Sequence, residues 1–261
     1  MDKSDIIKGL ETISNANIVR HTSNDRWYAK EGTMLWRPSV TTIIGGAISK
    51  GIGYDTWLGN QPSYKAACEE RDEAAARGTF VHNSVEQLIQ GQELKISEEI
   101  PNYEEICKHL MSFERFWKEQ EVEVVGTELF LYNEDVPWAG TPDIIAYVKG
   151  HLSIIDLKTG NYYKSHEVQL NMYAILLEKL LSLEENSLSI YGLYTKGRWI
   201  KEPNYGLKCF KRNNELPYAI ESVWAFLNSS TRGKPWPKDK YEIQKIFNLG
   251  GENDADDNFG I

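Results

Sequence analysis

Two acids and a lysine lie inside strongly apolar sequence near the middle of this 261-residue chain. Asp143 precedes the run Ile-Ile-Ala-Tyr-Val, and Asp156 and Lys158 end the run Ser-Ile-Ile-Asp-Leu-Lys. Both runs have the two-residue period of strands, and a Lys-Gly-His turn joins them. Residues two apart on a strand point to the same face, so Asp156 and Lys158 should project together beside Asp143. Such charges are costly to bury unless a metal ion or a reacting substrate satisfies them.

The surrounding sequence predicts further strands and helices around this pair of strands. Three strands in succession with tight connections predict an antiparallel meander, over residues 121–132, 138–148 and 152–158. Apolar residues at helical spacing predict helices over residues 64–90, 103–119, 165–181 and 217–227, with a further strand over 188–194. The predicted class is therefore α/β, with a mixed central sheet that contains the meander and is flanked by helices.

The length of the chain predicts one domain, over residues 1–249. Its first 63 residues are rich in aromatic side chains and broken by Gly and Pro, and we expect short helices and loops added to a core over 64–230. Within this addition, the run RPSVTTIIGG predicts a capped turn that leads into a short helix. Residues 250–261 carry four acids and no base, which predicts a disordered acidic tail.

Charge and cysteine content restrict the class of protein. A formal net charge of −9 argues against indiscriminate coating of duplex DNA, which cations drive. Three widely separated cysteines favour free thiols over disulfides or a thiolate metal site. No apolar run is long enough to cross a bilayer, and the N-terminus lacks the apolar core of a signal peptide. We therefore expect a cytoplasmic protein with no membrane partner.

The order of these residues resembles the PD-(D/E)XK nuclease superfamily. Pro142-Asp143, twelve further residues and then Asp156-Leu157-Lys158 match its signature. The RecB-like branch is similar over a longer stretch, through His82 in RGTFVHNSVEQLI, Glu128 before the meander, and Gln169 with Tyr173 in QLNMYA. The PSVT run, followed by an aromatic-bearing helix and RGTFVH, is similar to the mitochondrial genome maintenance exonuclease-like branch and its phage relatives.

The resemblance implies a restriction-endonuclease-like core that uses Mg²⁺ or Mn²⁺. The expected metal ligands are His82, Asp143, Asp156 and the backbone carbonyl of Leu157. Hard oxygen ligands with one imidazole suit these ions. Glu128 is expected to hold a second ion or a bound water, whereas Glu86 is either a ligand or a surface acid beside His82. The catalytic role of Asp143 and Asp156 is to hold the ion.

Three further side chains are expected to act on the substrate. Lys158 would orient the attacking water and stabilise the transition state. Gln169 and Tyr173, four apart on one helical face, would position the scissile phosphate or support the metal ligands.

Other residues are candidates for contact with the nucleic acid, chiefly Trp36, Ser39 and Arg198. Aromatic side chains in the first 64 residues either stack on unpaired bases or pack in the core (Trp27, Trp36, Trp57 and Tyr64). The basic stretch over residues 196–212 either follows the nucleic-acid backbone or is an ordinary charged loop.

The function implied is a metal-dependent DNA exonuclease that hydrolyses phosphodiester bonds from single-stranded ends, in replication, recombination or repair. It would act in a nucleoid or in the cytoplasm of a phage-infected host. The alternatives are an endonuclease or duplex-end exonuclease with the same centre, and a non-catalytic nucleic-acid-binding subunit. The acidic tail is a candidate contact for a replication or recombination protein. The chain has no helicase P-loop, so any unwinding motor is a separate chain.

Overall fold

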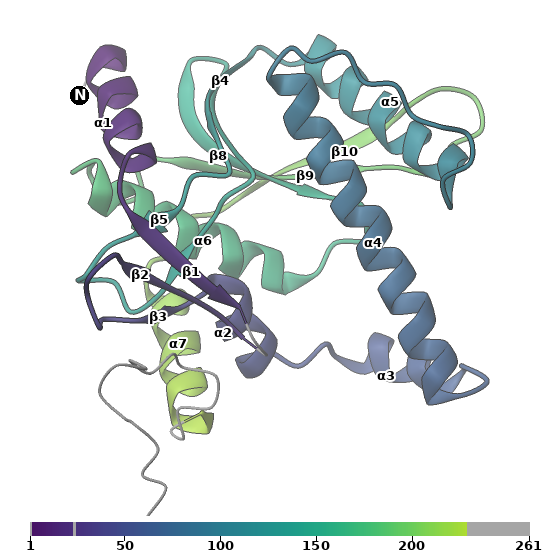
Figure 1. Cartoon of the computed structure of the whole chain (residues 1–261), viewed down its shortest axis with the longest axis horizontal. Helices are drawn as coiled ribbons and strands as arrows, with labels where there is room; N and C mark the ends of the chain where they lie inside the picture. Colours follow the sequence, from purple (N-terminus) through teal and green to yellow (C-terminus); the bar gives the residue numbers. More distant parts are fainter. Residues whose placement is uncertain (1, 23–24, 229–261) are drawn as a thin grey trace, which may run out of the picture.

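A five-stranded mixed sheet forms the centre of the computed structural model, which describes residues 2–22 and 25–228. The strand order is β10-β9-β8-β7-β4 (Figure 1), with β4 at Val122–Thr127, β7 at Ile144–Val148, β8 at His151–Lys158, β9 at Ser189–Thr195 and β10 at Tyr205–Phe210. Strands β4, β7 and β8 form the predicted antiparallel meander. Strand β9 lies parallel to β8, and helix α6 (Lys164–Leu180) makes the crossover between them. The predicted α/β class with a mixed sheet is confirmed.

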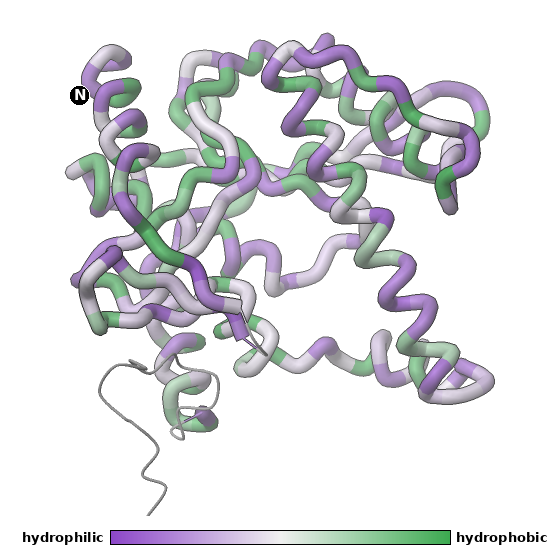
Figure 2. The backbone as a smooth tube through the Cα atoms, viewed as in Figure 1, coloured by the Kyte–Doolittle hydropathy of each residue, from purple (hydrophilic) through white to green (hydrophobic). Residues whose placement is uncertain are grey.

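Helices cover both faces of this sheet. Helices α4 (Tyr64–Ile89) and α5 (Tyr103–Glu119) pack on one face, where alternate strand residues such as Ile155 and Leu157 point. Helix α6 packs on the other face against Ile145 and Ile154. The N-terminal half of α4 extends beyond the sheet and is mostly hydrophilic (Figure 2), with residues 69–76 all exposed. The Asp156 and Lys158 side chains lie on the α6 face, because they share the two-residue period of Ile154.

The first 63 residues contain a sheet that we did not predict. Strands β1 (Ile18–Thr22), β2 (Arg26–Lys30) and β3 (Arg37–Pro38) pair in antiparallel order, so the expectation of helices and loops alone was wrong. The reason is that β2 buries three consecutive residues and therefore shows no two-residue alternation. Three helices complete the segment, α1 at Lys3–Ser14, α2 at Val40–Ala47 and α3 at Ile52–Gly59.

Two predicted strands are in fact divided. In place of a strand over residues 121–132, β4 ends at Thr127, and β5 (Leu131–Tyr132) pairs instead with β6 (Ala139–Gly140) in a separate sheet. Only Ile144–Val148 of the predicted strand 138–148 belongs to the central sheet. A register shift between Val124 and Gly126 and the left-handed backbone of Glu128, with φ of 50°, turn the chain away. These breaks place Glu128 and Asp143 outside regular strands.

Strand β10 was also missed, because it lies inside the basic stretch over residues 196–212 and follows Pro203 and Asn204. It is an edge strand, where a lysine such as Lys208 is common. The predicted helices are confirmed, and α7 covers Glu215–Leu227.

The domain boundaries stay a prediction, and the acidic tail lies outside the described residues. Within the described part of the chain, none of the helices is long and apolar enough to span a membrane.

The predicted capped turn is confirmed at Ser39, whose side chain is a helix cap. Its hydroxyl oxygen accepts a hydrogen bond from the Thr42 amide at 2.9 Å, and the residue is 2% exposed. We predict that Ser39→Ala lowers the free energy of unfolding by about 1 kcal/mol, because a helix amide loses its partner. Urea denaturation measures this change. The matched control is Ser222→Ala on the exposed surface of α7, which should change stability by less than about 0.5 kcal/mol.

Candidate active site

The strand pairing places the two acids of the central motif side by side. Asp143 immediately precedes β7, whose Ile144 pairs with Ile155, so Asp143 lies across from Asp156 on β8. The carboxylate of Asp143 accepts a hydrogen bond from the Leu157 amide at 2.6 Å. The backbone between the second acid and the lysine therefore fixes the first acid.

Gln169 on α6 links the other charged groups of the motif. Its amide nitrogen donates to Asp156 Oδ1 at 3.1 Å, and its Oε1 accepts from Lys158 Nζ at 3.3 Å. Lys158 Nζ also lies 2.5 Å from Asp156 Oδ2, in an ion pair that lacks hydrogen-bond alignment. Helix α6 thus holds the acid and the lysine in one fixed arrangement.

Tyr173, also on α6, contacts the Gln169 side chain. The phenol oxygen of Tyr173 accepts from the Gln169 amide at 3.3 Å, and the residue is 4% exposed. Its ring lies against Gly140, where a Cβ atom would come within 2.5 Å of the ring. Gly140, which precedes Thr-Pro-Asp in the motif, is therefore needed for the close approach of α6. We did not assign this role from the sequence.

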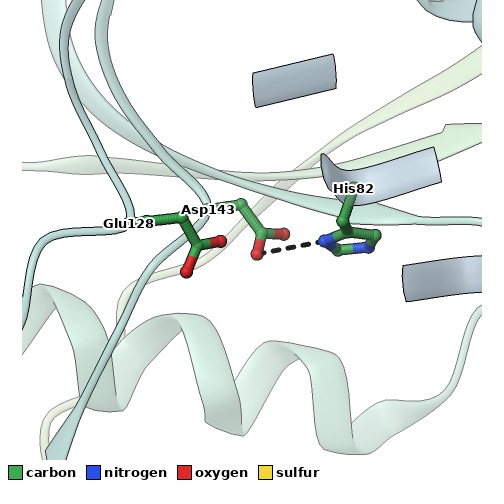
Figure 3. A group of neighbouring side chains, drawn as sticks. All are labelled: His82, Glu128 and Asp143. Carbon is green, nitrogen blue, oxygen red and sulfur yellow. Dashed lines mark ion pairs between the residues drawn. The ribbon is translucent and has the colours of Figure 1, made fainter. Parts of the chain in front are cut away.

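His82 and Glu128 complete a cluster around Asp143 (Figure 3). His82 Nδ1 lies 3.3 Å from Asp143 Oδ1, and one ligand atom from each of His82, Glu128 and Asp143 lies within 4.8 Å of the other two. His82 comes from α4, whereas Glu128 follows β4 and donates its backbone N–H to the Asp143 carbonyl at 3.3 Å. Three separate segments therefore converge on one point.

Burial raises the pKa values of two acids in this group. Burial, with the negative charges of Asp143 and Glu86, raises the pKa of Glu128 to about 7. Burial raises the pKa of Asp156 to about 6, although the Lys158 ammonium acts in the opposite direction. Both carboxyl groups therefore hold a proton more tightly than usual, chiefly because burial penalises the charged form.

At Asp143 and His82, neighbouring charges outweigh the effect of burial on the pKa. Burial alone would raise the pKa of Asp143, but the charges of His82 and Lys158 lower it. Burial alone would lower the pKa of His82, but the Asp143 carboxylate outweighs it and raises the pKa. Asp143 is consequently the acid that stays ionised most readily.

The cluster fits a divalent metal ion. Asp156 Oδ2 is buried and contacts the Lys158 ammonium at 2.5 Å without an aligned hydrogen bond among the described residues, so this carboxylate oxygen keeps a lone pair for a metal ion. Carboxylate oxygens with one imidazole are ligands that Mg²⁺ and Mn²⁺ accept. His82, Glu128 and Asp143 lie close enough together to share an ion, although Glu128 was expected at a second ion or a bound water, and these ligand roles stay predictions. Coordination by Asp156 and by the Leu157 carbonyl stays a prediction.

Among the described residues, no contact links the expected nucleic-acid-binding residues Trp36, Ser39 and Arg198 to the cluster of His82, Glu128 and Asp143. Ser39 is the buried cap of α2, and Trp36 is half-buried with its ring at 70° to that of His21, at a centroid distance of 6.3 Å. Arg198 is exposed and lies 3.9 Å from Glu105.

The other aromatic candidates divide between core and surface. Trp27 is a buried core residue, whereas Tyr64 is 74% exposed. Arg26, which we did not single out, lies close enough to Glu128 to lower its pKa against the larger effect of burial. Its sequence context carries no motif that would have revealed it.

The comparison with known families identifies the class of protein. The model of the PD-(D/E)XK nuclease superfamily matches residues 61–199, which include the cluster and the whole motif. This chain therefore belongs to the PD-(D/E)XK nuclease superfamily, as its sequence predicted. Members of this family use divalent metal ions, and the family implies a nucleic-acid substrate. The RecB-like branch and the mitochondrial and phage relatives stay a prediction.

Other comparisons add little. No curated protein matches the chain. Among solved structures, the chain is similar to an alkaline exonuclease from Laribacter hongkongensis, at 11% identity and a TM-score of 0.36, over 74% of this chain and 86% of that one. Similarity of this extent carries no information about the substrate of the present chain.

The raised pKa of Glu128 predicts how stability depends on pH in the metal-free protein. A carboxyl group whose folded pKa lies above its unfolded value stabilises the fold when protonated, and that stability is lost as pH rises from about 4.5 to about 7. We therefore predict that Glu128→Gln is more stable than the wild type at pH 8, by about 1 kcal/mol because solvent screens this partly exposed group, and that the gain vanishes at pH 4.

Urea denaturation in a chelating buffer at the two pH values measures this difference. Adding Mn²⁺ at pH 8 should reverse the order, because only the wild type keeps the carboxylate. Glu123→Gln, which removes an exposed carboxylate on β4, controls for the change in net charge. A variant no more stable than the wild type at pH 8 would show that Glu128 is not under electrostatic strain.

Proposed function

We propose that the chain is a metal-dependent DNA exonuclease that cuts phosphodiester bonds from single-stranded ends. The observation that carries the proposal is the joint geometry of Asp143, Asp156, Lys158 and Gln169 beside the cluster of His82 and Glu128. DNA as the substrate, the single-stranded end and the exonucleolytic mode follow from the resemblance to the mitochondrial and phage enzymes.

In this proposal His82, Glu128, Asp143, Asp156 and the Leu157 carbonyl hold Mg²⁺ or Mn²⁺. When bound, the ion supplies charge neutralisation at the phosphate and acidification of a water molecule. Asp143 is fixed for its part by the Leu157 amide and His82, so its carboxylate needs little rearrangement. Such preorganisation is what makes electrostatic stabilisation effective.

Lys158 acts as a positive charge and hydrogen-bond donor in the proposed reaction. Burial alone would lower the pKa of Lys158, but the charges of Asp156 and Asp143 outweigh it and raise the pKa. The ammonium therefore stays protonated near neutral pH and serves poorly as a general base. It orients the attacking water and stabilises the negative charge that develops on the phosphate oxygens.

Gln169 and Tyr173 are positioning residues in this account. Gln169 contacts both Asp156 and Lys158, and Tyr173 contacts Gln169 from a buried position. Between the two roles that the sequence left open, this arrangement favours support of the catalytic groups over direct contact with the scissile phosphate.

The surroundings of the reaction are also proposals. The activity would serve replication, recombination or repair, in a nucleoid or phage-infected cytoplasm. The intact set of acids and lysine argues against a non-catalytic subunit, because such a subunit has no use for a buried Asp156 and two further charged groups gathered around it. An endonuclease or duplex-end exonuclease with the same centre remains the alternative that a substrate assay separates. The acidic tail over 250–261 is a candidate contact for a replication or recombination protein.

Replacement of Lys158 tests the assignment most simply. We predict that Lys158→Ala lowers kcat on end-labelled single-stranded DNA by about 100-fold or more in Mg²⁺ or Mn²⁺, because a preorganised charge is removed. Lys95→Ala, at a side chain that is 85% exposed, is the matched control and should cut at the wild-type rate.

The same assay with different substrates separates the alternatives. Linear single strands should be degraded, while circular single strands and blunt duplexes should resist. Rapid cutting of circular single strands would show that the protein is an endonuclease. Equal cutting by Lys158→Ala and the wild type would show that the proposed catalytic centre is wrong.

Variants of the two α6 residues distinguish positioning from phosphate binding. Gln169→Ala should lower kcat by about 10- to 100-fold with little change in KM, because Lys158 and Asp156 lose their shared partner. Tyr173→Phe should have a smaller effect of the same kind, since the ring still fills the space beside Gly140. Steady-state kinetics with oligonucleotides of one length measures both. A rise in KM with unchanged kcat would assign Gln169 to ground-state binding of the substrate.

A further inference from the structure

A second concave site lies at the N-terminal end of α6, next to the candidate active site. It is a hollow of about 450 Å³ between the end of α2, the segment that leads into α3, and the first residues of α6. Figure 1 shows α2 below α6, with α3 continuing away from it toward the base of α4. The proposed reaction makes no use of this hollow.

The lining of the hollow is positively charged. It includes Lys50 and Lys164 and, among the residues that the structure describes, no acid, although the whole chain has a formal net charge of −9. Lys50 Nζ lies 4.3 Å from the ring centroid of Tyr54, which also packs against Trp57 with centroids 5.3 Å apart. The aromatic pair therefore supports the Lys50 ammonium at the wall of the hollow.

One aromatic ring in the hollow is available to a ligand. Tyr163 is 53% exposed, and its ring lies nearly perpendicular to that of His166, at a centroid distance of 5.7 Å and an interplanar angle of 82°. Exposed tyrosines beside lysines are the arrangement with which proteins bind unpaired nucleotides, by stacking the base and pairing the phosphate.

The position of the hollow relates it to the reaction. Tyr163 follows Lys158 by five residues, and Ser165 at the hollow lies one helical turn, about 6 Å, from Gln169 on α6. The five residues between them can span at most about 18 Å, so nucleotides next to a phosphate at Lys158 come within reach of Tyr163. Lys208 of β10, whose Nζ lies 3.5 Å from the ring centroid of Tyr162, adds a positive charge beside the loop that leads into α6.

We propose that this hollow binds an unpaired nucleotide of the substrate strand, with the base stacked on Tyr163 and the phosphates paired with Lys50 and Lys164. The proposal rests on the proposed nuclease function and adds a reason for its preference among substrates. A base can stack on Tyr163 only when it is not stacked inside a duplex, so the hollow favours single strands over paired ends.

Fluorescence of single-stranded oligonucleotides that carry 2-aminopurine at successive positions tests the site. The measurement uses full-length protein with Lys158→Ala, and a gel checks that the strand stays intact. Stacking on Tyr163 should quench the probe at one position. Adding Tyr163→Ala should abolish the quenching and weaken binding by about 10-fold, whereas Tyr163→Phe should preserve both.

Salt dependence tests the two lysines separately. For single strands the slope of log K against log salt changes by about 0.7 for each phosphate that the protein neutralises, so Lys50→Ala and Lys164→Ala should each make the slope shallower by about that amount. Phe226→Ala on α7 is the control, because this aromatic side chain is 82% exposed and lies outside the hollow. It should change neither the affinity nor the slope.

The proposal is overturned if Tyr163→Ala binds within about twofold of its parent and no probe position is quenched. It is also overturned if the variant loses affinity for blunt duplex as much as for single strands. Failure of the proposed function would be seen in a different measurement. The gel would then show that the Lys158→Ala protein digests the oligonucleotide at the wild-type rate.

Discussion

The Asp143 carboxylate is held between the Leu157 amide and the His82 imidazole, and the rest of the site depends on this arrangement. The first interaction needs β7 and β8 in their observed register, since a slip by one residue would move the amide away and turn Asp156 to the other face. The second interaction needs α4 packed against the same sheet. One acid thus links the pairing of the strands, the packing of a helix and the charge of the candidate metal site.

Glu128 and Asp156 are both held in conditions that cost free energy in the absence of a metal ion. Glu128 adopts a left-handed backbone that costs free energy for a residue with a Cβ, and burial and neighbouring acids raise the pKa of its carboxyl group. Burial and the negative charge of Asp143 raise the pKa of Asp156, and its Oδ2 contacts Lys158 without an aligned hydrogen bond among the described residues. A fold that only had to be stable would replace these groups. A divalent cation between them would relieve the repulsion, which is why we interpret the cluster as a metal site.

The sequence predicted the central strands and helices because their periodicity is set by burial on one or two faces. Asp143, Asp156 and Lys158 could be placed together for the same reason, since strand geometry alone fixes their side. Glu128 and Gly140 could not be placed, because a bulge, a left-handed residue and a close ring contact depend on tertiary packing. Strand β2 was missed because three consecutive buried residues leave no alternation. The proximity of Arg26 to Glu128 and the hollow beside Tyr163 were missed because each brings together segments that are distant in sequence.

The most direct test of the account is the position of the metal ion itself. A crystal grown with Mn²⁺ and measured for anomalous scattering should show a peak about 2.0–2.6 Å from the carboxylate of Asp143 and within reach of His82 and Glu128. Crystals of Asp143→Asn grown in the same way should lose that peak while keeping the fold. A wild-type crystal with no anomalous peak between these side chains, or with its only ordered ion elsewhere, would contradict the central claim.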